Sequence, residues 1–64
     1  MTRIRRGGYV FMTWIGDHAP PHVHVYRDGR LVMKWDLKEG CVVFGAADRR
    51  VMLTIRALQK EGRL

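Results

Sequence analysis

The first two thirds of the chain consist of short apolar or alternating segments that predict β-strands. Residues 9–15 are aromatic and β-branched, which favours an extended backbone. Asp28-Gly29 joins two alternating segments and is typical of a tight hairpin, because both central positions of that turn need a positive φ. Residues 38–40 end in glycine and suit a three-residue hairpin loop. The predicted strands are residues 9–15, 22–27, 30–37 and, shorter than the others, 41–44.

The Asp28-Gly29 turn also predicts a register, with Arg27 opposite Arg30 and, counting inward, Val25 opposite Val32. Side chains alternate across a strand, so this register assigns each residue to one of two faces. The first predicted face carries His22, His24, Tyr26, Leu31, Met33, Trp35, Leu37, Cys41 and Val43. The second predicted face carries Val23, Val25, Val32, Lys34, Asp36, Val42 and Phe44.

Residues 49–61 have the periodicity of an amphipathic helix. Val51, Ile55 and Leu58 recur at i, i+4 and i+7, and Asp48 before them is a good N-cap. The predicted fold class is α+β, a small antiparallel β-meander of three to four strands followed by one C-terminal α-helix. We expect a single domain with three segments. These are a basic N-terminal arm (1–8), the meander (9–46) and the helix (48–62).

Both predicted faces of the sheet are largely apolar, whereas one helix can cover only one of them. Soluble monomers rarely expose a large apolar patch. We therefore expect a second chain on the open sheet face, either another copy in a homodimer or a small partner protein. The alternative is that Lys34, Asp36 and long basic side chains screen this face from water.

The composition narrows the class of protein. The chain of 64 residues has a single cysteine, Cys41, so no disulfide forms within it. The longest apolar run, residues 9–15, is far shorter than the roughly 20 residues of a membrane-spanning helix. No apolar segment of signal-peptide type follows the basic N-terminal residues. We therefore expect a cytoplasmic protein without a membrane segment.

The charge favours an anionic partner. Twelve Lys and Arg against six Asp and Glu give a net charge of +6, which is typical of proteins that bind RNA or DNA. The positive residues fall in the arm, at the hairpin tip and along the outer side of the helix. We predict nucleic-acid contacts from Arg3, Arg5, Arg6, Arg27, Arg30, Arg49, Arg56 and Lys60. The alternative is that the helix residues form only a solvated surface.

All three histidines lie in one segment with a carboxylate. Asp17, His18, His22 and His24 fall within eight residues, and the last two project from the same side of a strand. Pro20-Pro21 stiffens the loop between them. Three alternatives stay open: a structural cluster, a divalent metal site with imidazole and carboxylate ligands, or acid–base and phosphate chemistry. A metal ion is the one cofactor that the pattern suggests.

The segment Asp17-His18-Ala19-Pro20-Pro21-His22-Val23-His24-Val25 resembles the Asp-His-x-Pro-Pro-His-x-His-Val signature of a small bacterial family, called domain of unknown function 4160. The aromatic strand before it, a turn near Gly40 and the closing helix are also similar. The resemblance covers about residues 9–58. It implies no established activity. Members are often encoded beside another small domain, and such pairs have been suggested to be toxin–antitoxin modules, with this type of chain as the candidate toxin.

These observations favour a small basic interaction domain, a toxin–antitoxin component that binds nucleic acid and a small partner protein. One alternative is a minimal ribonuclease, metal-free or metal-dependent, in which His22 and His24 act with His18 and Asp17. Another is a purely protein-binding regulatory module. The ribonuclease requires exposed, convergent histidine rings, and the binding functions do not.

Overall fold

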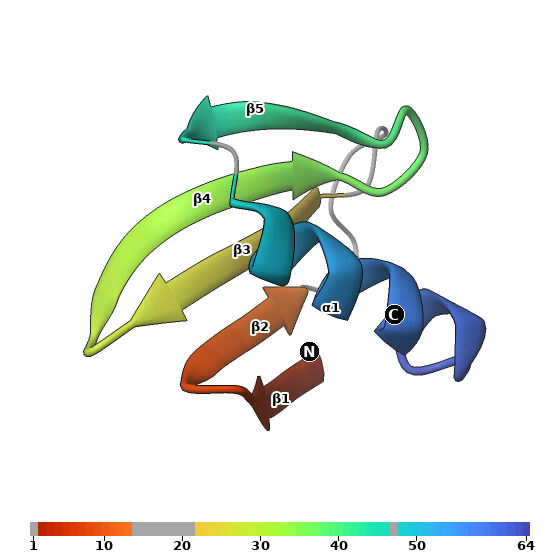
Figure 1. Ribbon diagram of the computed structural model, residues 1–64, viewed down its shortest axis with the longest axis horizontal. Coiled ribbons are helices and arrows are strands. Elements are labelled where there is room, and N and C mark those ends of the chain that lie inside the picture. Colours follow the sequence, from red (N-terminus) through yellow and green to blue (C-terminus); the bar gives the residue numbers. More distant parts are fainter. Residues whose placement is uncertain (1, 14–21, 47) are drawn as a thin grey trace.

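The computed structural model describes residues 2–13, 22–46 and 48–64, which form five strands and one helix. In chain order these are β1 (Thr2–Arg6), β2 (Tyr9–Thr13), β3 (His22–Arg27), β4 (Arg30–Asp36), β5 (Cys41–Gly45) and α1 (Arg49–Lys60). The strands form one antiparallel sheet in the order β1-β2-β3-β4-β5, and α1 lies across one face of it (Figure 1). The predicted α+β class, a meander followed by one C-terminal helix, is confirmed.

The sheet has five strands rather than three to four, because residues 2–6 form an edge strand where a basic arm was predicted. β1 pairs with β2 so that Ile4 lies opposite Phe11, and both side chains are buried. Gly7 and Gly8 join the two strands with φ of 60° and 82°, and two successive positive φ values are typical of a two-residue hairpin turn. The last two residues of the predicted strand 9–15 lie outside the described residues.

The hydrophobic core lies between the sheet and α1. The predicted helix stripe of Val51, Ile55 and Leu58 is buried against the sheet. Burial of each such side chain contributes roughly 1.5–3 kcal/mol. The buried apolar residues among those described are Ile4, Phe11, Val23, Val25, Met33, Trp35, Val51, Ile55 and Leu58. Among the described residues, no helix is long and apolar enough to cross a membrane.

Local signals set both ends of α1. The Asp48 carboxylate accepts hydrogen bonds from the backbone N–H groups of Arg50 (2.8 Å) and Val51 (3.2 Å), so the predicted N-cap is confirmed. At the other end Gly62 has a φ of 77° and donates its backbone N–H to the carbonyl of Gln59 at 3.0 Å. The helix therefore occupies nearly the range that the apolar periodicity predicts.

A β-bulge in β4 changes the predicted register. Arg27 pairs with Arg30 as predicted, but Val25 pairs with Met33, because Val32 is an extra residue without a Cα partner. The prediction that Val25 lies opposite Val32 was therefore wrong.

Because of the bulge, the residues of β4 from Met33 onward lie on the opposite sides of the sheet from those predicted. Met33 and Trp35 are buried in the core, on the same side of the sheet as the valines of β3. Lys34 and Asp36 consequently lie on the other side. The histidines of β3 pair with these two polar residues and not with Met33 and Trp35.

A second bulge lies in β5, where Val43 has no Cα partner. Lys34 pairs with Phe44, whereas the next residue of β4 pairs with Val42. Phe44 therefore shares the face of Lys34 and projects away from α1, opposite to the valines of β3 with which it was predicted to lie. Gly45 follows at a φ of 82°, and a Cβ at this position would overlap the carbonyl oxygen of Val32.

We call the side of the sheet away from α1 the open face, because none of the described helices or strands packs over it (Figure 1). Its residues follow from the pairing and from the alternation of buried and partly exposed side chains. They are Arg3, Arg5, Val10, Met12, His22, His24, Tyr26, Leu31, Lys34, Asp36, Cys41 and Phe44.

Replacing Gly45 by alanine should destabilise the protein more than the same change at Gly40. Both glycines have a positive φ, so each substitution carries a backbone cost of about 1–2 kcal/mol. Only at Gly45 does the new methyl group also meet backbone, the carbonyl of Val32. Urea unfolding of the two variants measures the difference. Equal losses of unfolding free energy would show that the close approach at the bulge does not hold in solution.

Candidate nucleic-acid interface

One row of open-face residues crosses the whole sheet. Successive Cα pairs connect Arg3 to Met12, Met12 to His24, His24 to Lys34 and Lys34 to Phe44. Neighbouring strands are about 4.8 Å apart, so the row extends for roughly 19 Å. It begins with a guanidinium at one edge of the sheet and ends with an aromatic ring at the other.

A second row runs beside the first, from Arg5 through Val10 and Tyr26 to Leu31. At its β1 end, Arg3 and Arg5 border a shallow hollow of about 500 Å³. The remaining lining of this hollow is Gly8, Val10, Asp28 and Gly29. The β1–β2 turn, with Gly8, and the β3–β4 turn, with Gly29, thus lie beside the guanidinium groups of two arginines. Arg3 and Arg5 project from the same side of β1.

Lys34 and Phe44 form a cationic and aromatic pair at the other end of the first row. The Lys34 ammonium lies 5.5 Å from the centroid of the Phe44 ring, within the range of a cation–π contact. The Phe44 side chain is nevertheless half exposed. The sequence analysis named neither as a site residue, because without the bulges Phe44 and Lys34 were predicted to share a face with Val23 and Val25 and not with the histidines.

Asp36 is a buried carboxylate on the open face, with 3% of its surface exposed. Its Oδ1 accepts hydrogen bonds from the backbone N–H groups of Lys38 and Glu39, both at 2.8 Å. Its Oδ2 lies 4.0 Å from Nε2 of His22, longer than a hydrogen bond. The His22 side chain is 33% exposed, so one of the two predicted catalytic rings is accessible from solvent. Asp36 thus orders the β4–β5 turn and lies beside His22.

The histidine cluster is described only in part. His22 and His24 share the open face, as their spacing predicts. Asp17, His18 and the two prolines lie outside the described residues, so their predicted approach to these rings stays a prediction. Within residues 2–13, 22–46 and 48–64, no three His, Cys, Asp or Glu side chains form a group that could hold a metal ion.

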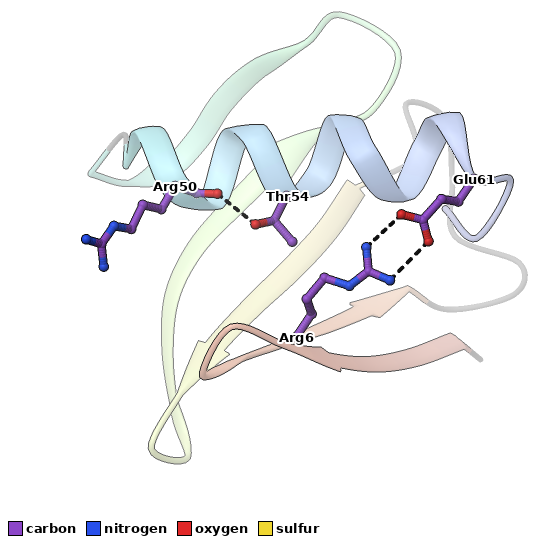
Figure 2. Close-up of polar contacts among 4 residues, drawn as sticks. All are labelled: Arg6, Arg50, Thr54 and Glu61. Atoms are coloured by element: carbon purple, nitrogen blue, oxygen red, sulfur yellow. Dashed lines mark hydrogen bonds and ion pairs between the residues drawn. The ribbon is translucent and has the colours of Figure 1, made fainter.

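Arg6 does not belong to the open face, although the sequence grouped it with Arg3 and Arg5. It projects toward α1 and makes a bidentate ion pair with Glu61, with N–O distances of 2.8 and 3.0 Å (Figure 2). Hydrogen bonding to Arg6 lowers the pKa of Glu61 below its ordinary value of 4.5, and the same bond raises the pKa of Arg6. The pair joins edge strand β1 to the end of the helix.

The other predicted cations lie elsewhere. Arg27 stacks over the Tyr9 ring with its guanidinium carbon 5.6 Å from the centroid, and Arg30 is exposed beside the turn. The exposed helix cations Arg49, Arg56 and Lys60 belong to α1, which covers the opposite side of the sheet from the open face. The predicted nucleic-acid residues therefore divide between two surfaces.

Among the described residues, most Lys and Arg side chains make no ion pair. The described residues include all twelve Lys and Arg side chains, and of these only Arg6 has a carboxylate within 4.0 Å among the same residues. Several carboxylates have structural roles instead: Asp36 and Asp48 accept hydrogen bonds from backbone N–H groups, and Glu61 binds Arg6. Within the part of the chain that the structure describes, eleven cations thus have no carboxylate partner.

The fold and the open face define a small, basic α+β domain in which one helix supports a five-stranded sheet. A family profile described as "Domain of unknown function (DUF4160)" matches residues 7–63, and the chain belongs to this family. No curated protein and no solved structure matches the chain. The profile match confirms the family that the sequence resembles.

The Arg6–Glu61 pair should make stability depend on pH. Because the folded protein lowers the pKa of Glu61, the stabilisation is present above the ordinary value of 4.5 and is lost as the pH falls through the lower folded pKa. Glu61→Gln should therefore lower Tm slightly at pH 7 and leave it unchanged toward about pH 2. Glu39→Gln removes an exposed carboxylate that has no ion pair in the described chain and is the control. An equal Tm of both variants at pH 7 would show that the Arg6–Glu61 pair does not stabilise the protein in solution.

Proposed function

We propose that this chain is a nucleic-acid-binding domain whose open face contacts the ligand. The observation that carries the proposal is the combination of unpaired cations and an exposed aromatic ring on that face. Arg3, Arg5 and Lys34 project from it without carboxylate partners among the described residues, and Phe44 lies at its edge. The acidic residue within the face, Asp36, is buried and accepts hydrogen bonds from two backbone N–H groups.

Phosphate contacts explain why such a face suits a polynucleotide. Arg3 and Arg5 are two residues apart on one strand, which separates their Cα atoms by about 6.6 Å. Cations at regular intervals neutralise successive phosphates and release the counterions condensed on the nucleic acid. The turn glycines beside the arginines, Gly8 and Gly29, add no side chain to the hollow.

The open face supports this function better than the helix surface, although α1 carries three of the predicted cations and the open face carries two. Arg49 and Arg56 border a hollow whose other lining residues are Met52 and Leu53. These aliphatic side chains do not stack with bases as an aromatic ring does. The helix cations are therefore proposed as a secondary, nonspecific contact surface.

We propose a wider role as a cytoplasmic toxin–antitoxin component that also binds a small partner protein or a second copy. Edge strands offer unpaired backbone groups to strands of other chains. β1 protects its edge with three arginines, whereas β5 has no charged residue, and Val43 and Phe44 on it are exposed. The proposed contact is therefore the backbone edge of β5.

A minimal ribonuclease is the second candidate. His22 is partly exposed on the same face as the unpaired arginines, so a bound RNA backbone would lie near an imidazole. General acid–base cleavage needs such a group within hydrogen-bond reach of the reacting hydroxyl. Binding and cleavage would then share one surface.

The salt dependence of binding tests which surface is used. Replacing Arg3, Arg5 and Lys34 together by alanine should reduce the slope of log K against log salt by about two to three units, because each phosphate contact contributes about 0.7–0.9. Fluorescence anisotropy with a labelled RNA and a labelled DNA oligonucleotide measures the slope.

The control replaces Arg49, Arg56 and Lys60, which removes the same charge from the other side of the molecule. It should change the slope by less than one unit. A larger effect of the helix variant than of the sheet variant would assign binding to α1. No measurable affinity of the unmodified protein for either oligonucleotide at low salt would refute nucleic-acid binding.

A further inference from the structure

We infer that the open face binds a single-stranded nucleic acid, with a base stacked on Phe44 and the backbone following the row of residues toward Arg3. This inference rests on the proposed function and specifies the form of its ligand. It follows from the position of the aromatic ring, the placement of the cations and the width of the sheet.

The exposure of Phe44 is the first observation. Phe44 is 50% exposed, whereas Phe11, Met33 and Trp35 of the same sheet are almost completely buried. The bulge at Val43 turns Phe44 to the open face. An aromatic ring held on a strand at the edge of a basic surface is a platform for base stacking, which tolerates any base because every base has a π-face.

The position of Lys34 is the second observation. Its ammonium lies 5.5 Å from the Phe44 ring centroid, so one cation is held directly beside the platform. A nucleotide stacked on the free part of the ring would have its phosphate within reach of this ammonium. The contact with the ring also leaves Lys34 without a carboxylate partner among the described residues.

The row of paired residues is the third observation. From Phe44 the row continues through Lys34, His24 and Met12 to Arg3, over roughly 19 Å. Tyr26, partly exposed, stands on β3 in the adjacent row. The path thus has a cation beside Phe44 at one end, Lys34, and another at the far edge, Arg3, and is long enough for several nucleotides of an extended strand.

A double helix does not fit this arrangement, because the faces of its bases are already stacked on one another. Stacking on Phe44 requires a base that is splayed out of the stack, and single strands offer such bases without the cost of melting pairs. The contacts proposed are to base faces and phosphates. Oligouridine and oligodeoxythymidine are therefore expected to bind with similar affinity.

The test compares Phe44→Leu with Leu53→Ala, a control at an equally exposed apolar position (55%) on α1. The probes are a fluorescein-labelled 12-nucleotide oligouridine, the matching oligodeoxythymidine and a 12-base-pair duplex. We expect the unmodified protein to bind the single strands more tightly than the duplex. Phe44→Leu should weaken single-strand binding about 5- to 150-fold with an unchanged salt slope. Phe44→Tyr should restore it, and Leu53→Ala should have no effect.

The outcomes separate this inference from the proposal on which it rests. Oligouridine affinity of Phe44→Leu equal to that of the unmodified protein, or tighter binding of the duplex, would overturn the single-strand inference while nucleic-acid binding stands. Absence of binding to all three probes would refute both. Because Phe44 is half exposed, the variants should fold, and far-ultraviolet circular dichroism with thermal melts confirms that they do.

Discussion

Burial of one side of the sheet under a single helix is the constraint on which the rest of this molecule depends. Val51, Ile55 and Leu58 of α1 can cover one face of five strands and no more. The two-residue period of a strand then sends every alternate side chain to the opposite side. Once Val23 and Val25 are in the core, the histidines between and before them must lie on the open face. The composition of the candidate interface is therefore a consequence of core packing.

The two bulges change this alternation at the strands that matter most for function. Each adds one unpaired valine, Val32 in β4 and Val43 in β5. After each extra residue the strand resumes with its facing reversed, so that Lys34 and Phe44 reach the open face. Glycine at position 45 permits the close approach of the two bulged strands, because a Cβ there would overlap the Val32 carbonyl. The same local irregularity thus shapes the edge of the sheet and the proposed stacking platform.

The sequence predicts the parts of the fold that have strong local signals. The Asp28-Gly29 hairpin turn and the helix capped by Asp48 are such parts, because turn and cap chemistry act over a few residues. β1 was not predicted, because its one buried side chain, Ile4, has arginines on both sides in the sequence. The bulges were not predicted, because a continuous apolar run such as residues 31–33 is compatible with either register.

The sequence predicts the class of ligand that the candidate site binds, but not which residues form the site. The excess of arginine and lysine indicates an anionic ligand, but charge alone does not say which cations share a surface. Arg6 illustrates this, since it lies beside Arg5 in sequence and binds Glu61 on the other side of the sheet. Phe44 could be recognised as a site residue only after the sheet pairing was known.

The most direct test of this account is a map of backbone amide chemical shifts in the ¹⁵N-labelled protein as oligouridine is added. If the open face binds the nucleic acid, the largest shifts fall in the open-face rows, at Arg3, Arg5, Lys34 and Phe44, and the exposed side of α1 changes little. Shifts concentrated in residues 49–60, with those rows unchanged, would contradict it.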